Sequence, residues 1–402
     1  MSKKEKKQIA VEEPIVLDIP EDEIWTYRVD GLAAPHINKP YKNFGIKKFI
    51  FAIVIIIAVS VSCYFSVRTV QKDTFEYNQT ESGYQLEKFS NTGYITTLDI
   101  DFVSSVEYDR DNADVNTNFT IIKDETKKVI SVGAYALNCD EKVKVINIGA
   151  DVEFVDPKAF YSCWALQEVR VDENNTNYCD VEGVLFNKDK TEIIFRPCDH
   201  DTYLAEKYGY AKYDDYGARI EPSPEDENYA QYVNDVLTYV VPSSVETIGQ
   251  LCFNYANMKN VYLPEGLKTI ETLGFFEIPL LEGVYSYKGE NADSHFTDES
   301  ALGEVYVSLP EGLEYIGSDA FSYNQDMTYI YIPESVTFIG HHAFWDTVYK
   351  EGDELKGISA INVAHSEEEF KKSVETGDSW RPQYDYFLFK KSIDINYSAE
   401  RN

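Results

Sequence analysis

Apolar and polar positions alternate along this chain in a pattern that returns about every 22 or 23 residues. An apolar residue is followed by another three positions later and by a third five positions after that. The six copies are Val129/Val132/Leu137, Val152/Val155/Phe160, Val245/Ile248/Phe253, Leu267/Ile270/Phe275, Leu313/Ile316/Phe321 and Val336/Ile339/Phe344. Periods of this length are typical of repeats that each form one coil of a longer array.

Proline and glycine occupy fixed places in the pattern. Proline stands three residues before the first apolar position in four copies (Pro242, Pro264, Pro310 and Pro333). Glycine follows the second apolar position in four copies (Gly133, Gly249, Gly317 and Gly340). The residues before each proline alternate with period two, as in Val261/Leu263 and Ile330/Ile332, which predicts a strand with one buried face. The proline then ends the strand, because it cannot donate a hydrogen bond to the ladder.

One such unit cannot bury its apolar side alone, whereas stacked units can. We therefore expect a mainly β fold with short turns and helices, in which residues 129–365 form a solenoid of coils. The phenylalanines, including Phe160, Phe253, Phe321 and Phe344, should form one continuous spine. Residues 199–235 and 282–304 break the period and are expected to be insertions. Residues 68–128 are expected to form a stalk and N-terminal cap, and residues 366–402 a closing segment.

An uncharged stretch of 19 residues, from Phe49 to Val67, precedes this array. A helix of that length spans about the thickness of a bilayer core. Lys47 and Lys48 stand directly before it, which favours a cytoplasmic N-terminus and an exported C-terminus. We therefore expect a single transmembrane α-helix at 49–67 in the cell membrane, behind a cytoplasmic tail (1–48) with little fold of its own. A cleaved signal peptide and a lipoprotein-type cleavage before Cys63 are alternatives.

Charge and cysteine content limit the partners and cofactors. The chain has a formal net charge of -32, and all of the acidic excess follows residue 67. Such a surface repels nucleic acid, so no nucleic-acid partner is expected. Outside the apolar segment the cysteines are Cys139, Cys163, Cys179, Cys198 and Cys252. Their odd number and the absence of a CxxC pair indicate neither a disulfide framework nor a zinc site, although one disulfide remains open.

The repeats resemble a known family. The segments IYIPESVTFIGHHAF and YVVPSSVETIGQLCF are similar to the repeats of BspA-like (Treponema pallidum-type) leucine-rich-repeat surface proteins. Cys139 and Cys163 match a cysteine column of that pattern, and residues 174–197 and 363–380 resemble two of its other elements. The resemblance implies a surface-exposed scaffold for adhesion and matrix binding, and it carries over no binding residues.

Motifs for chemistry are missing from the sequence. It holds no HExxH, no GxSxG, no P-loop and no GxGxxG after a strand. His341 and His342 are expected to be half-exposed loop residues, and Cys179 with His200 does not suggest a catalytic pair. The acidic run at 109–116 lacks the glycine of an EF-hand, so a solvated loop is favoured over a calcium site. We predict no enzyme activity, no metal and no cofactor; a hydrolase site within 199–235 is a minor alternative.

A solenoid offers its partner an extended sheet face. The strand positions expected to face outward include Asn147 and four tyrosines. The tyrosines, Tyr262, Tyr306, Tyr329 and Tyr331, are the candidate ligand-binding residues. Tyrosine gives rigid contact area with a polar tip, which suits protein or glycan recognition, although high β-propensity alone also explains such a row. The sequence thus favours a membrane-anchored surface protein that binds an extracellular protein or glycan; the alternative is an envelope scaffold that recruits partners through its tail.

Overall fold

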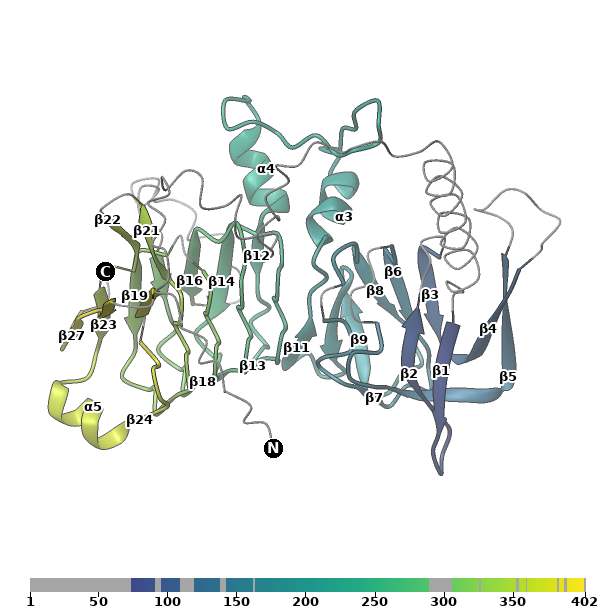
Figure 1. The fold of residues 1–402 in the computed structure, drawn as a ribbon, viewed down its shortest axis with the longest axis horizontal. Helices are drawn as coiled ribbons and strands as arrows, with labels where there is room; N and C mark the ends of the chain where they lie inside the picture. Colours follow the sequence, from purple (N-terminus) through teal and green to yellow (C-terminus); the bar gives the residue numbers. More distant parts are fainter. Residues whose placement is uncertain are drawn as a thin grey trace, which may run out of the picture. The chain divides into compact units, whose positions relative to one another are not determined.

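The computed structural model describes residues 74–400, except 91–94, 109–118, 138–141, 162, 289–305, 325–326, 352–353, 359, 382 and 387–388 (Figure 1). The expected tail (1–48) and transmembrane segment (49–67) therefore lie outside the described residues. Within the described part, no helix is both long enough and apolar enough to cross a membrane.

The described chain begins with a five-stranded sheet that leads into the first repeat. Its strands are β1 (Thr74–Gln79), β2 (Tyr84–Ser90), β4 (Phe102–Tyr108), β5 (Phe119–Val132) and β7 (Phe154–Val155). The pairs β1–β2 and β4–β5 are antiparallel, whereas β2 and β7 run parallel to β5. Because β5 is one continuous strand of 14 residues, the expected boundary at residue 128 falls inside it.

Each later coil contributes a strand to what we call the long-strand side. One group on this side is β3 (Thr97–Ile100), β6 (Val145–Ile148) and β8 (Glu168–Val171). The other is β12 (Thr238–Val240), β14 (Asn260–Pro264), β16 (Gly283–Tyr287), β17 (Tyr306–Ser308), β19 (Tyr329–Ile332), β23 (Ala360–Val363) and β27 (Ile395–Tyr397). All neighbours within each group are parallel. The strands predicted before the prolines are confirmed, and residues such as Val261 and Ile330 are fully buried.

A second parallel ladder forms the short-strand side. It consists of β11 (Glu192–Phe195), β13 (Thr247–Ile248), β15 (Thr269–Ile270), β18 (Tyr315–Ile316), β20 (Phe338–Ile339) and β24 (Glu375–Thr376), preceded by the antiparallel strands β9 (Tyr178–Val181) and β10 (Val184–Asn187). One isoleucine in each of five strands of this ladder is fully buried: Ile193, Ile248, Ile270, Ile316 and Ile339. Gly249, Gly317 and Gly340 each follow an isoleucine of this ladder, and a Cβ at any of them would stand 2.7 Å or less from a backbone atom of the preceding coil. A Cβ at Gly340 would stand 2.3 Å from the backbone nitrogen of Ser318, so only glycine fits there.

The turns that follow the short strands form a third side, which we call the turn side. Backbone amides on this side donate to carbonyls of the next coil at every second residue. Within one pair of coils, Leu251, Phe253 and Tyr255 donate to Thr272, Gly274 and Phe276 at 3.2, 3.0 and 3.3 Å. Successive coils are thus joined by backbone hydrogen bonds on all three sides.

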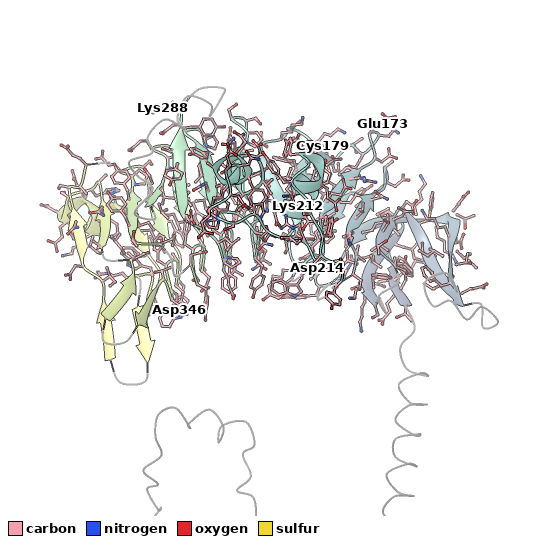
Figure 2. The ribbon with its side chains drawn as sticks, turned by 90° about the horizontal axis from the view of Figure 1, so that it is seen from above. Glu173, Cys179, Lys212, Asp214, Lys288 and Asp346 are labelled. Carbon is pink, nitrogen blue, oxygen red and sulfur yellow. The ribbon has the colours of Figure 1, made fainter. Side chains whose placement is uncertain are left out.

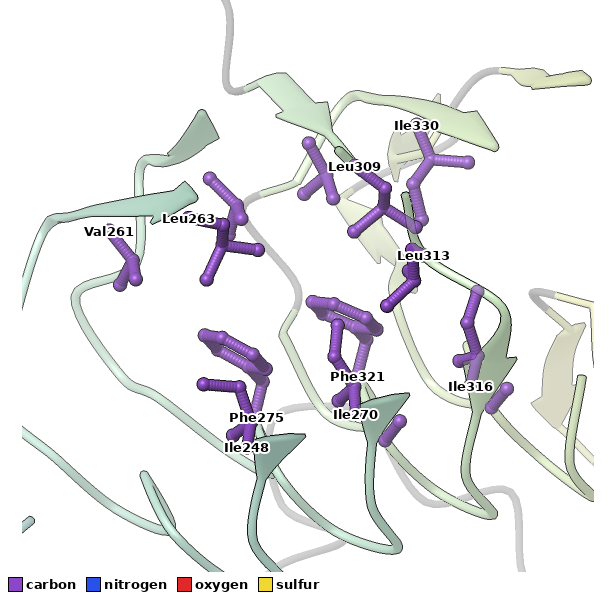
Figure 3. Packing of buried hydrophobic residues seen from close by; sticks show 14 of the residues in the cluster. Ile248, Val261, Leu263, Ile270, Phe275, Leu309, Leu313, Ile316, Phe321 and Ile330 are labelled. Carbon is purple, nitrogen blue, oxygen red and sulfur yellow. The ribbon is translucent and has the colours of Figure 1, made fainter. Parts of the chain in front are cut away.

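Between the three sides lies a column of aromatic rings (Figure 3). Phe253, Phe275, Phe321 and Phe344 are fully buried, and their consecutive ring centroids are 4.9, 5.0 and 5.5 Å apart. Trp380 continues the column at 6.4 Å from Phe344. The predicted phenylalanine spine is therefore present in this part of the chain.

The prediction of a single continuous spine is wrong. Phe160 contacts Phe195 at 5.1 Å in a separate apolar cluster that belongs to the first coils. The next residue, Arg196, is buried, and its guanidinium lies over Tyr239, whose ring contacts Phe253. A buried guanidinium thus occupies the place where another apolar ring would have joined the two parts of the predicted phenylalanine spine.

The two segments expected to be insertions contain ordered elements. Residues 283–287 form β16, which pairs with β14 and β17 and is therefore a member of the long-strand side. Its Val284 is buried in the same core as its neighbours, and its Tyr287 is buried in a separate small cluster with Tyr262. The other segment contains α3 (His200–Lys207) and α4 (Tyr229–Val236).

The closing segment completes both ladders. After β23, α5 (Glu367–Ser373) begins with a capping box in which Ser366 and Glu369 satisfy each other's backbone amides. The chain then adds β24 to the short-strand side and β27 to the long-strand side. Two antiparallel hairpins decorate this end: β21 (Val348–Glu351) with β22 (Glu354–Gly357), and β25 (Gln383–Tyr386) with β26 (Phe389–Ser392).

The ring column predicts the stability of the array. Replacing Phe321 with alanine should lower the free energy of unfolding by about 3–5 kcal/mol, because the cavity opens between two stacked rings and neither neighbour can collapse into it. The exposed Glu334 is the control, and its change to alanine should cost less than about 0.5 kcal/mol. Both are measured by urea denaturation of the full chain; equal midpoints for the two variants would contradict the role of the column.

Candidate binding surfaces

The outward face of β3, β6 and β8 carries a row of polar side chains. The parallel register places Asp99, Asn147 and Arg170 side by side. Asn147 donates its side-chain amide to Asp99 at 2.6 Å, and Lys123 of β5 donates to both Asp99 and Asp101 at 2.9 and 2.7 Å. We call Asp99, Asn147 and Arg170 the polar row.

This row keeps its charges. Partial burial opposes ionisation of Asp99, but the hydrogen bond from Asn147 and the ammonium of Lys123 outweigh it and hold the pKa of the carboxyl below its usual value. The guanidinium of Arg170 pairs with Glu168, which raises its pKa, and its side chain remains 58% exposed. The row therefore presents an ionised carboxylate, an oriented amide and an accessible cation on one sheet face.

A pocket of about 370 Å³ opens over the polar row. Its walls also include Asp101, Asp151 and Asp172 and the backbone of the loop after β6. Such a lining offers hydrogen-bond donors and acceptors at fixed positions, as sites for polar ligands do. The sequence alone predicts an outward position only for Asn147, whereas the register of β3 and β8 against β6 adds the other two residues.

The four candidate tyrosines lie in two columns of the second strand group. Tyr306 pairs with Tyr329 in one column, and Tyr262 and Tyr331 belong to the other. The exposure expected of an outward-facing row is not found for the second column, because Tyr262 is only 9% and Tyr331 only 4% exposed. Tyr262 stacks on Tyr285 at 5.1 Å, and the Tyr331 hydroxyl donates to Glu311 at 3.2 Å. Whether these tyrosines bind a ligand remains a prediction.

The segment with α3 and α4 bridges an interruption of the long-strand side. Within the described residues, no strand of the long-strand side follows directly after β8. Instead, the carbonyl of Gly183 accepts a hydrogen bond from the Val169 amide of β8 at 2.9 Å. At one end of the segment, Asp199 accepts from the Gln167 side chain at 2.9 Å. At its other end, the carbonyl of Leu237 accepts from Lys259 and Asn260. The segment thus fastens to the coils on both sides of the break.

Apolar packing and one buried ion pair hold this segment together. Leu204, Tyr232 and Val236 form the centre of a small apolar cluster of their own. Arg219 pairs with Asp201, which is almost fully buried, and with the more exposed Glu221. Figure 2 labels Lys212 and Asp214 in the loop between the helices. A second pocket, of about 390 Å³, lies within the segment and is lined by Tyr210, Lys212, Glu221, Asp226 and Tyr232, among others.

His200, Cys198 and Cys252 are buried and uncharged, whereas Cys179 is half-buried. Burial lowers the pKa of His200 to about 3, and its Nδ1–H donates to the carbonyl of Gln167 at 2.8 Å. Burial raises the pKa of the Cys198 thiol to about 12 and that of Cys252 well above its usual value. Cys179 donates to the carbonyl of Asn187 at 3.3 Å rather than to a base. The neutral imidazole of His200 and the protonated thiols of Cys198 and Cys252 are packed in the interior.

The remaining predictions concern the acidic run, the cysteines and the two adjacent histidines. The acidic run at 109–116 and Cys139 lie outside the described residues. The four described cysteines carry free thiols, and Cys163 is buried as expected of a core position. Among the described residues, no group of three or more His, Cys, Asp or Glu could hold a metal ion. His341 is exposed and His342 partly buried, with ring centroids 3.7 Å apart.

The burial of His200 predicts how stability depends on pH. The unfolded chain binds a proton at this histidine below about pH 6.5, whereas the folded chain stays neutral there down to about pH 3. Stability from this group is complete above pH 6.5 and is lost as the pH falls, by up to about 1.4 kcal/mol per pH unit. His200→Asn should therefore make the decline between pH 6.5 and 5 shallower in urea titrations of the full chain. An unchanged slope in a folded variant would contradict this assignment.

The described coils can be compared with known proteins. A family model for the BspA type leucine rich repeat region matches residues 65–181 and 227–350, in six copies. The stretch between the two matches includes α3 and the loop that leads to α4. No curated protein matches the chain.

Several solved structures are similar to this chain. A leucine-rich repeat protein from Eubacterium ventriosum has 15% identity over 65% of this chain and 60% of its own, with a TM-score of 0.37. The pneumococcal vaccine antigen PcpA has 16% identity over 68% and 66%, with a TM-score of 0.37. A leucine rich cell surface protein from Faecalibacterium prausnitzii has 14% identity over 82% and 76%, with a TM-score of 0.30.

The chain spans less than two thirds of the length of the first two of these structures. The family assignment rests instead on the repeats themselves. The family model matches more than half of the chain, and the coils it matches repeat the strands and turns described above. The chain therefore belongs to the family of BspA-type leucine-rich-repeat proteins.

Proposed function

We propose that this chain is a membrane-anchored protein of the cell surface whose coils bind an extracellular protein or glycan. The observation that carries the proposal is the polar row in its pocket on the long-strand side. Asp99, Asn147 and Arg170 offer an acceptor, an amide and a cation whose positions are set by strand register and hydrogen bonds. Preorganised polar groups of this kind need little reordering when a ligand binds.

The proposed anchor is the uncharged segment at 49–67, with the tail on the cytoplasmic side. Its support is the length of the apolar run and the lysines that precede it. In this arrangement the coils face the outside, where a row of hydrogen-bonding side chains meets matrix proteins and glycans.

The binding proposal is tested with the purified full chain on panels of matrix proteins and oligosaccharides. A ligand of the polar row should lose at least about tenfold in affinity in Arg170→Ala and in Asn147→Ala, as expected when a central contact is removed. Lys88→Ala, which removes an exposed cation from β2, is the control and should bind as the unaltered chain does. If no member of broad panels binds saturably, or if the row variants bind as tightly as the control, the proposal fails.

The anchoring proposal is tested by proteolysis of intact cells that produce the full chain. External protease should remove the coils and leave residues 1–48 protected until the membrane is opened. Cleavage of the tail from outside, or recovery of the chain in the soluble fraction, would contradict this topology. Deleting residues 1–40 adds a second readout: a partner that is lost only on this deletion would favour the tail as the recruiting surface.

A further inference from the structure

Aromatic side chains follow the buried phenylalanines on the turn side, one or two positions further along the chain. Tyr161 follows Phe160, Phe276 follows Phe275, and Trp345 follows Phe344. Tyr255 and Tyr323 stand two residues after their phenylalanines. Tyr135 and Trp164 extend the series at its N-terminal end. We call these seven residues the aromatic ridge.

The members of the ridge touch across successive coils. Tyr135 contacts Tyr161 edge to face at 6.0 Å. The Tyr255 ring lies 4.2 Å from Trp164 and 6.0 Å from Phe276, and Phe276 lies 5.3 Å from Tyr323. At the end of the ridge, Trp345 lies 4.4 Å from the His342 ring. Trp164, Tyr255, Phe276 and Tyr323 thus form one connected row of rings. Tyr135 and Tyr161 form a contacting pair in the earlier coils, and the Tyr323 amide donates to the carbonyl of Trp345 in the next coil at 2.9 Å.

These rings remain accessible although each is fixed at its base. Tyr135, Trp164 and Tyr323 are 48, 43 and 42% exposed, and the other four are partly buried. Tyr255 and Tyr323 have positive φ angles of 57° and 63°, which are unfavourable for tyrosine. The turn-side hydrogen bonds hold this backbone, so large rings stand where glycine or asparagine would fit with less strain. A row of exposed aromatic residues on rigid turns is the composition of an interaction surface.

Carboxylates flank the ridge. Burial raises the pKa of Tyr323, and the nearby carboxylates of Asp346, Asp319 and Glu277 raise it further. Burial and the carboxylate of Glu277 also raise the pKa of Tyr255. Figure 2 shows Asp346 on the side of the coils away from Lys288, which follows β16 of the long-strand side. The chain as a whole carries a net charge of -32.

We propose that the aromatic ridge binds a segment of a partner protein that is rich in arginine and lysine. Cations are attracted to the faces of tyrosine and tryptophan rings, and neighbouring carboxylates add to this attraction. The same charges repel nucleic acid and acidic polysaccharides. The turn side is a different side of the coils from the polar row, so this surface is separate from the one on which the proposed function rests.

The probe is a labelled peptide of alternating arginine and glycine, titrated into the full chain at about 0.15 M salt, where distant charges are screened. A peptide with citrulline in place of arginine and the neutral sugar cellohexaose are the comparison ligands. The arginine peptide should bind, and the double variant Tyr255→Asn/Tyr323→Asn should weaken it about tenfold, which corresponds to two lost cation–π contacts. Asparagine is chosen because it tolerates a positive φ and leaves the net charge unchanged.

Two further variants distinguish binding by the rings of the ridge from attraction by charge or by any exposed tyrosine. Tyr216→Asn removes a tyrosine that is 95% exposed in the loop between α3 and α4, and it should leave the affinity unchanged. Glu277→Gln/Asp346→Asn keeps the rings and should weaken the arginine peptide without altering the near-ultraviolet circular dichroism. Arg170→Ala should not affect the peptide, so the failure of one surface does not imply the failure of the other.

Two results would overturn the proposal. If the arginine peptide binds equally well with and without the two tyrosines, only the bulk charge of the chain attracts it. If cellohexaose binds through the same tyrosines and the arginine peptide does not, the ridge is a glycan platform.

Discussion

The structure depends on the burial of each coil's apolar edge by the next coil. Isoleucines on the short-strand side and phenylalanines between the three sides have zero exposure only because a neighbour covers them. Backbone hydrogen bonds on all three sides set the distance between coils, and glycines such as Gly340 allow the backbones to approach that closely. Stability therefore arises between repeats rather than within them.

The long-strand side also contains an interruption, which affects how its coils are joined. Between β8 and β12 the long-strand side lacks a strand, and the spine is divided at Arg196. A break of this kind exposes two apolar ends. The segment with α3 and α4 has an apolar cluster of its own and is hydrogen-bonded to the coils on both sides of the break. Its buried Arg219–Asp201 pair ties the loop between the helices to α3. The irregular segment is thus part of what holds the two halves of the array together.

Side chains that face away from the core are not constrained by the stacking of the coils. The long-strand side and the turn side carry different kinds of side chain at these positions. The first strands of the long-strand side carry hydrogen-bonding groups in a pocket, whereas later strands carry tyrosines that pack on one another. The turn side carries aromatic residues at places where the backbone itself is strained. One scaffold thereby offers a polar and an aromatic surface on different sides of the same coils.

The period, the strands before the prolines and the buried Ile and Phe columns followed from the sequence. Each depends on local alternation and on the stacking of equivalent positions from coil to coil. The strand β16 was missed because its coil lacks the proline and glycine that mark the others. The polar row needed the register between β3, β6 and β8, and the aromatic ridge needed left-handed turns at Tyr255 and Tyr323. The burial of Tyr262 and Tyr331 could not be read from alternation, which gives the face of a strand but not what covers it. Sequence determines which residues repeat, whereas tertiary packing decides which of them meet and which remain in contact with solvent.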